Sequence, residues 1–322
     1  MDAVSMIESL IRACMCLAGI MGNNLLAIRS LPRLKAGIHT SEVLFINLAV
    51  SNLLTNLLVD LPDTIADFAQ QWILGETYCG LFYFFADLSE TSSIYTTFFI
   101  SIYWHRKLVG SLRSGGAPVL LDSLRLVGWL LAGSWAVAGV FGIPHCFFVT
   151  VLVANGSYEC VKLFPDALAM KTYEIFYLTL ANVIPVAGIV VASSQIVVTL
   201  LRHQRRIRGH QCDPTKQKKG PNRGQSGHCP ALNVATDTEP KPGQTSAGPG
   251  PGSQVRAAKS VVAVAGVFLV CWMTHLLLRI SSNVHTSSTV VEVASYVAAS
   301  YTSIIPYIFL HGVKKLSCPC RC

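Results

Sequence analysis

Charged residues are scarce in this chain. Only 13% of its 322 residues are Asp, Glu, Lys or Arg, whereas 52% are hydrophobic. A soluble protein of this length would carry about 25% charged residues over the surfaces of its domains, so the composition excludes that class. Apolar residues are plentiful and Gly and Pro show no repeat period, which excludes collagen, whole-chain disorder and a small disulfide scaffold. A polytopic membrane protein remains.

The sequence also lacks the motifs of common enzyme classes. It has no His-Glu-x-x-His zinc helix, no Gly-x-x-x-x-Gly-Lys phosphate loop and no Gly-x-Ser-x-Gly elbow. Scattered Ser, His and Asp residues occur no more often than chance allows. We therefore expect a protein that is not an enzyme and that uses no metal or cofactor.

Seven stretches are long and apolar enough to cross a bilayer, which requires roughly 20 mostly apolar residues for about 30 Å of hydrocarbon. They are residues 6–29, 43–68, 78–104, 124–148, 173–201, 259–280 and 289–311. The first is the least apolar because Glu8 and Arg12 lie in its first turns, where an i,i+4 pair can reach the interface together. The sequence predicts an all-α seven-transmembrane helix bundle.

Basic residues set the orientation, because Lys and Arg resist translocation across the membrane. The connections after spans one, three and five and the tail hold 21 of the 25 Lys and Arg residues. The first span carries no basic segment or cleavage site of a secretory signal peptide, so we expect it to be retained. We predict a plasma-membrane protein with its N-terminus outside and its C-terminus in the cytosol. The +8 net charge reflects this bias and contact with anionic lipid, and it implies no nucleic-acid partner.

The connection between spans five and six is a long polar insert. Fourteen of the 43 residues of segment 212–254 are Pro or Gly, and such a segment cannot bury enough apolar surface to offset its ordering entropy. We predict a disordered cytosolic loop here. It separates helices one to five (1–211) from helices six and seven (255–311), and a short cytosolic tail follows (312–322).

Cysteines and one Asn mark sites of covalent chemistry. Cys79 opens span three and Cys160 lies in the outer loop after span four, so a disulfide is chemically allowed there, the alternative being two unpaired thiols. Asn155, in the same loop, begins the glycosylation acceptor Asn-Gly-Ser. Three residues of the tail suit S-palmitoylation, although exposed reduced thiols are equally compatible with the sequence: Cys318, Cys320 and Cys322.

Short motifs stand in a fixed order inside the spans. They are Gly22-Asn23, Leu48-Ala49-Val50-Ser51-Asn52, Trp129, Pro185, Cys271-Trp272 and Pro306. Together with seven spans, an outer N-terminus, Cys79 and Cys160, they make the chain resemble the rhodopsin-type G-protein-coupled receptors.

Several positions depart from the usual pattern of that family and resemble one branch of it. Asn52 stands where span two usually has Asp, Thr274 replaces the Pro after the span-six Trp, and Ile305 replaces the Asn before Pro306. These departures, with segments 47–53, 61–68 and 201–206, resemble the vomeronasal type 1 receptors and the related fish olfactory receptors. The resemblance implies chemosensory detection of a small organic ligand, coupled to a cytosolic heterotrimeric G protein.

Ionisable and polar residues in the outer halves of the spans are candidate ligand contacts, because ionisable groups at that depth are costly unless they face a cavity or a partner. They are Asp87, Glu90, Thr91, His275, Arg279, Glu292 and Tyr296. A protonated or salt-bridged structural role is the alternative for the acids of span three. A free Arg279 favours an anionic ligand, whereas Arg279 paired with Glu292 or Glu90 lets the pocket admit an amine.

At the cytosolic end, the resemblance implies that Arg106, with His105 beside it, contacts the G protein or locks the inactive bundle. Arg106 is shifted from the family's usual register. The basic residues that continue span five could meet an acidic face of the same partner or lipid headgroups. They are Arg202, Arg205 and Arg206.

Two further expectations follow from what spans two and seven lack. Asn52 and Ile305 supply no carboxylate where related receptors bind sodium, so we predict little sodium modulation. Residues 289–311 contain no Lys for a retinal Schiff base, which argues against a light receptor. A transporter or channel that uses the intramembrane acids as a coupling path is the alternative function.

Overall fold

The computed structural model describes most of the chain. The described residues are 3–32, 37–112, 120–154, 156–211, 251–281, 296–297 and 299–313. Several predicted sites lie outside them: Asn155, Glu292, Cys318, Cys320, Cys322 and residues 212–250 of the predicted loop. The helices include His275, Arg279 and Arg206, whose side chains lie outside the described part.

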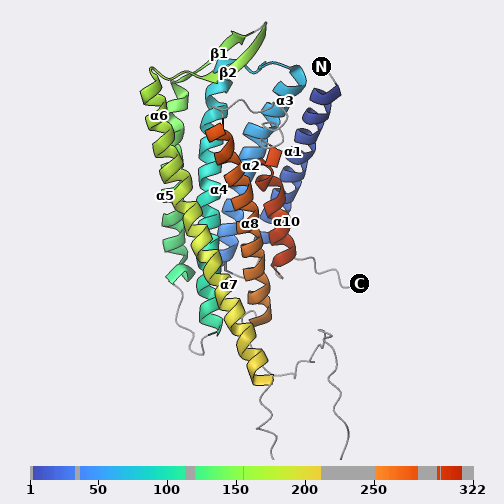
Figure 1. The fold of residues 1–322 in the computed structure, drawn as a ribbon, viewed down its shortest axis with the longest axis vertical. Helices are drawn as coiled ribbons and strands as arrows, with labels where there is room; N and C mark the ends of the chain where they lie inside the picture. The colour runs from blue at the N-terminus through green and yellow to red at the C-terminus, as the bar shows by residue number, and fades with distance from the viewer. Residues whose placement is uncertain are drawn as a thin grey trace, which may run out of the picture.

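Helices pack side by side along most of the molecule's length, as Figure 1 shows. They are α1 (Ala3–Ser30), α2 (Thr40–Thr55), α3 (Leu61–Ala69), α4 (Gly75–Leu112), α5 (Leu124–Gly142), α6 (Ala167–Phe176), α7 (Ile184–Gln211), α8 (Pro251–Ser281) and α10 (Tyr301–Gly312). π-helical turns at Asn56–Asp60 and Tyr177–Val183 join α2 to α3 and α6 to α7. Counting each joined pair as one rod gives seven rods in the described part, which confirms the predicted all-α seven-helix bundle.

Within the described residues, five helical segments are long and apolar enough to cross a membrane. They are Ser5–Ser30, Thr40–Ala69, Leu124–Cys146, Ala167–Arg205 and Gln254–Thr274. The longest helix, α4, is more polar because it lies among α2, α5, α7 and α8 and buries its polar side chains, such as Ser92 and Thr96, against them. A helix surrounded by protein can carry polar groups that lipid would not solvate.

Apolar side chains cover the outer faces of the peripheral helices. Met21 on α1, Trp129 and Val140 on α5 and Val191 on α7 are each more than half exposed. In water such a surface would promote aggregation, whereas in a bilayer it is the solvated surface. The bundle therefore agrees with a multi-pass membrane protein.

A β-hairpin follows α5 and was not predicted. Its strands, β1 (Val149–Ala154) and β2 (Ser157–Lys162), are antiparallel and pair from Val149 with Lys162 to Ala154 with Ser157. The sequence contained a signal for it, because an Asn-Gly dipeptide between β-prone segments is a strong hairpin signal. Gly156 has φ +84°, the left-handed region that such turns need. The hairpin lies at the end of the bundle where α1 begins (Figure 1).

Several helix ends differ from the predicted spans. α5 stops at Gly142 and gives way to a 3₁₀ turn at Ile143–Cys146, because Pro144 supplies no backbone donor. α8 begins at Pro251, inside the loop predicted as disordered. α6 begins before residue 173, where the side chain of Asp166 accepts a hydrogen bond from the backbone N–H of Ala169.

Candidate functional site

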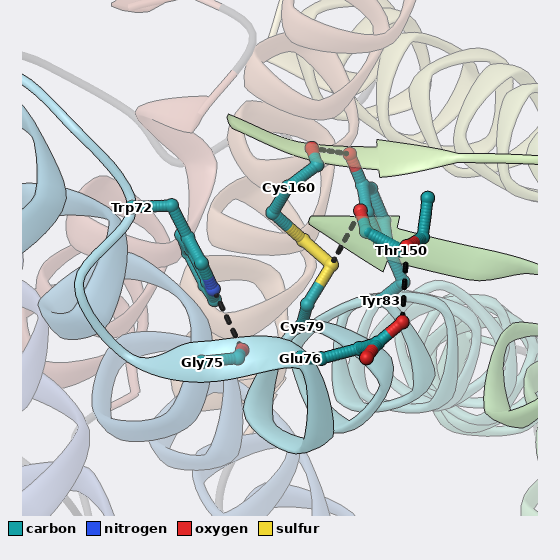
Figure 2. Close-up of a disulfide and its surroundings, with 7 residues drawn as sticks. All are labelled: Trp72, Gly75, Glu76, Cys79, Tyr83, Thr150 and Cys160. Carbon is teal, nitrogen blue, oxygen red and sulfur yellow. Dashed lines mark hydrogen bonds between the residues drawn. A yellow bond between two sulfur atoms is a disulfide. The ribbon is translucent and has the colours of Figure 1, made fainter. Parts of the chain in front are cut away.

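A disulfide joins Cys79 to Cys160 and confirms the predicted bridge. Cys79 lies in the first turns of α4 and Cys160 in β2, so the bond attaches the hairpin to the mouth of the bundle (Figure 2). Two hydrogen bonds reinforce the attachment. The hydroxyl of Thr150 donates to Glu76 Oε1 at 2.9 Å, and the hydroxyl of Tyr83 donates to the carbonyl of Cys160 at 3.2 Å. The hairpin is thereby held over the outer ends of the helices.

Asp87 is buried, and its hydrogen-bond partners come from two other segments of the chain. Its Oδ2 lies 2.7 Å from His145 Nε2, in the 3₁₀ turn after α5, and accepts a hydrogen bond of 2.6 Å from the hydroxyl of Tyr173 on α6. The side chain of His145 is fully buried. The carboxylate is therefore satisfied inside the protein, the structural alternative that the sequence left open. His145 and Tyr173 carried no sequence signal that tied them to Asp87.

Glu90 lies one turn further along the same face of α4. The hydroxyl of Tyr177 donates to Glu90 Oε2 at 3.2 Å, and the rings of Tyr173 and Tyr177 stack with their centroids 6.1 Å apart. Asp87 and Glu90, one turn apart on α4, thus accept hydrogen bonds from two tyrosines that are one turn apart on the neighbouring rod. Thr91 is fully buried, and its hydroxyl has no hydrogen-bond partner among the described residues.

Tyr296 lies on the other side of the bundle, beside a cavity of about 280 Å³. The lining consists of Arg12, Met15, Cys16, Asp60, Asp63, Thr64, Tyr296, Ala299, Thr302 and Ser303. Among the lining residues that the structure describes, Tyr296 is the one predicted ligand contact. The structure therefore does not bring it together with Asp87 and Glu90, whose hydrogen-bond partners lie in the 3₁₀ turn after α5, on α6 and in the π-helical turn that follows.

Arg12 has partners that the sequence analysis did not identify. Its guanidinium forms ion pairs with Asp63 and, at 3.0 Å from Nε to Oδ2, with Asp67, both on α3. It also lies over the ring of Tyr296, 5.3 Å from the ring centroid. These ion pairs join α1 to α3 and were not predicted. A partner 51 residues away along the chain leaves no local pattern to read.

Amide and hydroxyl groups fill the centre of the bundle between α1, α2, α4 and α10. Asn52 Nδ2 donates to Asn23 Oδ1 at 3.1 Å, and the hydroxyl of Ser93 donates to Asn52 Oδ1 at 2.8 Å. Asn23 Nδ2 donates to the backbone carbonyl of Thr302 at 3.0 Å. The amide oxygens of Asn23 and Asn52 are thus already paired with protein donors.

A groove of about 610 Å³ lies at the cytosolic end, between α4 and α7. It is lined by His105, Val109, Leu112, Ser194, Gln195, Val198, Thr199, Arg202 and His203. The structure thus brings together two of the predicted coupling residues, His105 and Arg202. Arg106 and Arg205 are exposed beside it and are not among its lining residues.

The family of the chain follows from comparison with known sequences. The family model of the seven-transmembrane receptors of the rhodopsin family matches residues 23–308. The chain belongs to this family. It is therefore a multi-pass receptor of the plasma membrane and not an enzyme.

Curated relatives of the receptor are rhodopsins of arthropods. The chain is 24% identical to the rhodopsin of Cambarus hubrichti over 204 residues, which cover 63% of this chain and 65% of the relative. It is 26% identical to the rhodopsin of Orconectes australis over 62% of this chain and 64% of the relative, and 23% identical to the long-wavelength rhodopsin of Apis mellifera over 62% and 52%. The chain thus covers less than two thirds of the length of these relatives.

Proposed function

We propose that the receptor is chemosensory, of the pheromone or odorant type, and that a small organic ligand in the outer part of the bundle activates a heterotrimeric G protein. The observation that carries this proposal is the polar cavity of about 280 Å³ in the outer half of the bundle. Pockets for small molecules are concave, partly apolar and fitted with a few convergent polar groups. The resemblance to vomeronasal type 1 receptors supports the same conclusion.

A light receptor is the competing function, because the relatives are named rhodopsins. A retinal Schiff base requires an amine in the bundle, and residues 289–311 contain no Lys. The chemosensory assignment therefore accounts for span seven better than photoreception does.

Two groups of residues are proposed to serve the ligand. Glu90 and Thr91 offer a half-buried carboxylate and an unpaired hydroxyl on α4. Asp87 holds Tyr173, whose ring stacks on Tyr177, the partner of Glu90. Tyr296 lines the second region, and the predicted contacts that complete the set are His275, Arg279 and Glu292.

The cytosolic groove is proposed to receive the G protein. His105 and Arg202 line it, and the exposed Arg106 and Arg205 supply positive charge that suits an acidic surface of the partner. Arg206 is the remaining contact predicted from the sequence. Glycosylation at Asn155 and acylation at the tail cysteines remain proposals from the sequence.

The test is expression of the full chain with a promiscuous G protein and a screen of matched amines, carboxylic acids and sterols in the dark. A response to one chemical class, lost in either Glu90→Gln or Arg279→Ala but not in both, identifies the counter-ion. Ligand-evoked current without any G protein would contradict the proposal. Responses in both variants equal to the wild-type response would reject Glu90 and Arg279 as ligand contacts and leave the receptor function standing.

A further inference from the structure

Asp60 is the last residue of the irregular turn that joins α2 to α3. The π-helical turn Asn56–Asp60 interrupts the rod, and Pro62 follows it. Such turns re-aim side chains and occur frequently at functional sites. The hydroxyl of Tyr78 donates to the carbonyl of Leu58 at 3.2 Å and so satisfies a group that the irregular turn leaves outside the regular helix ladder. The turn places Asp60 in the lining of the cavity beside α1.

The carboxylates around this cavity differ in their partners. Asp63 and Asp67 form ion pairs with Arg12. Asp60 Oδ2 accepts a hydrogen bond of 2.8 Å from Asn56 Nδ2, and Asp60 forms no ion pair within the described ranges. Asp60 and Asp63 both line the cavity, and of these two carboxylates Asp60 is the one without an ion-pair partner among the described residues. An ionisable group at this depth marks a functional site by default.

The remaining walls fit a short ligand with one polar end. Met15, Cys16 and Ala299 are small or flexible apolar groups. The hydroxyl of Ser303 already donates to the carbonyl of Met15 at 2.7 Å, so its oxygen is left to accept a hydrogen bond. A ligand that donates several hydrogen bonds is therefore matched better than one that only accepts them.

An anionic ligand fits poorly in the same space. Arg12 is the cation of the lining, and its guanidinium is already neutralised by Asp63 and Asp67. An anion would have to displace these carboxylates and would then lie in the same cavity as Asp60. Like charges in a medium of low dielectric repel strongly. A cation meets no such penalty, because it supplies the charge that Asp60 lacks.

We propose that this cavity, between α1, the turn before α3 and the start of α10, binds a small protonated amine with Asp60 as its counter-ion. The volume of about 280 Å³ limits the ligand to a few carbon atoms or one ring. The inference rests on the proposed chemosensory function and names the ligand class. It also assigns the counter-ion to a residue outside the set predicted from the sequence.

The test measures binding and signalling separately on the full chain. The purified receptor is titrated with primary amines from methylamine to 2-phenylethylamine, with 2-phenylethanol and 3-phenylpropionate as neutral and anionic matches, and thermal stabilisation reports binding. We expect an amine to stabilise the receptor and the matched alcohol and acid to leave its stability unchanged. Asp60→Asn should lower the affinity for the amine at least about 10-fold. Asp122→Asn, which removes one exposed charge at the cytosolic end, is the matched control and should bind like the wild type.

Each outcome decides the inference. Stabilisation by the acid overturns it. It is also overturned if no amine stabilises the receptor, or if Asp60→Asn binds the amine with the same affinity as the wild type. If Asp60→Asn does not fold, Ala299→Leu fills the same cavity without altering charge, and retained amine binding in that variant also overturns it. Amine binding that never activates a G protein leaves the site standing and defeats the chemosensory function. Signalling in response to another ligand class that is unaffected by Asp60→Asn defeats the amine site and leaves the chemosensory function standing.

Discussion

Asp87 illustrates how a single carboxylate is accommodated inside the bundle. It gives up the hydration it would have in water, and it receives hydrogen bonds from Tyr173 and His145 in exchange. A buried carboxylate is tolerable only while these partners remain, because its desolvation penalty is large. Asp60 makes no comparable ion pair among the described residues, and this difference separates a structural acid from a proposed binding acid.

Replacing His145 by Phe should destabilise the receptor more than replacing Asp87 by Asn. His145→Phe leaves a buried carboxylate without one of its partners, which costs about 3 kcal/mol. Asp87→Asn removes the charge while its side-chain oxygen can still accept from Tyr173, which costs about 1 kcal/mol. Thermal unfolding in detergent micelles measures both. A smaller loss for His145→Phe than for Asp87→Asn would show that the contact is not structural.

Gly188 is a second site where one residue matters, because α7 packs closely on α4 there. A Cβ atom at Gly188 would lie 2.2 Å from Cε2 of Phe98, so Gly188→Val should cost about 1–3 kcal/mol of stability. The matched control is Gly133→Ala on α5, where the added Cβ has open space and the melting temperature should stay the same or rise. An unchanged melting temperature for Gly188→Val would mean that the two helices lie further apart.

At the scale of elements, the hairpin depends on its disulfide. A two-stranded sheet is marginal by itself in water, and β1–β2 is fixed to α4 by the bond between Cys79 and Cys160. The hairpin also contacts the loop before α4, where the backbone N–H of Trp72 donates to the carbonyl of Tyr158 at 2.7 Å. The bond and these contacts hold the hairpin above the two regions proposed to receive the ligand.

Replacing Cys160 by Ser should therefore lower stability and ligand affinity together. In the chain-entropy model, a bridge across 81 residues contributes about 4 kcal/mol, which would be lost in Cys160→Ser. Cys146→Ser removes an exposed free thiol and is the control expected to behave like the wild type. The measurement is the melting temperature with and without reductant. A wild-type receptor that is insensitive to reductant would contradict the structural role of the bond.

The elements predicted correctly from the sequence are the spans, because a helix that crosses lipid must be a long apolar run. The topology that follows from the spans placed Cys79 and Cys160 on the same side of the membrane. The hairpin was missed because the Asn-Gly turn was read only as an acceptor for glycosylation. The ion pairs of Arg12 with Asp63 and Asp67, and the bond from His145 to Asp87, depend on how distant segments pack. No local pattern encodes them.

In the molecule as a whole, the central amide network ties four helices together, and Asn56, which accepts from Asn23 and donates to Asp60, links it to a carboxylate. Asn23 on α1, Asn52 on α2, Ser93 on α4 and the backbone of Thr302 on α10 are joined in a single set of hydrogen bonds. In the network, amide oxygens that could bind a hard cation are already engaged by protein donors. The predicted lack of sodium modulation therefore has a structural reason.

Exchanging sodium for potassium at equal ionic strength should leave the melting temperature of the purified receptor unchanged, because Asn23 and Asn52 supply no carboxylate and their amide oxygens already accept from protein donors. Asn52→Asp restores the acid and should create a difference between the two salts. A wild-type receptor that sodium stabilises, or an Asn52→Asp variant that responds to neither ion, would contradict this reading of the network.

The most direct test of the account is nucleotide exchange on a G protein by the purified receptor, measured in the dark with the panel of amines, acids and sterols, and separately after incubation with retinal under light. We expect exchange stimulated in the dark by one class of small molecule. We also expect no visible absorption band and no effect of light after retinal, because span seven offers no Lys. Light-dependent exchange by the retinal-treated receptor would contradict it.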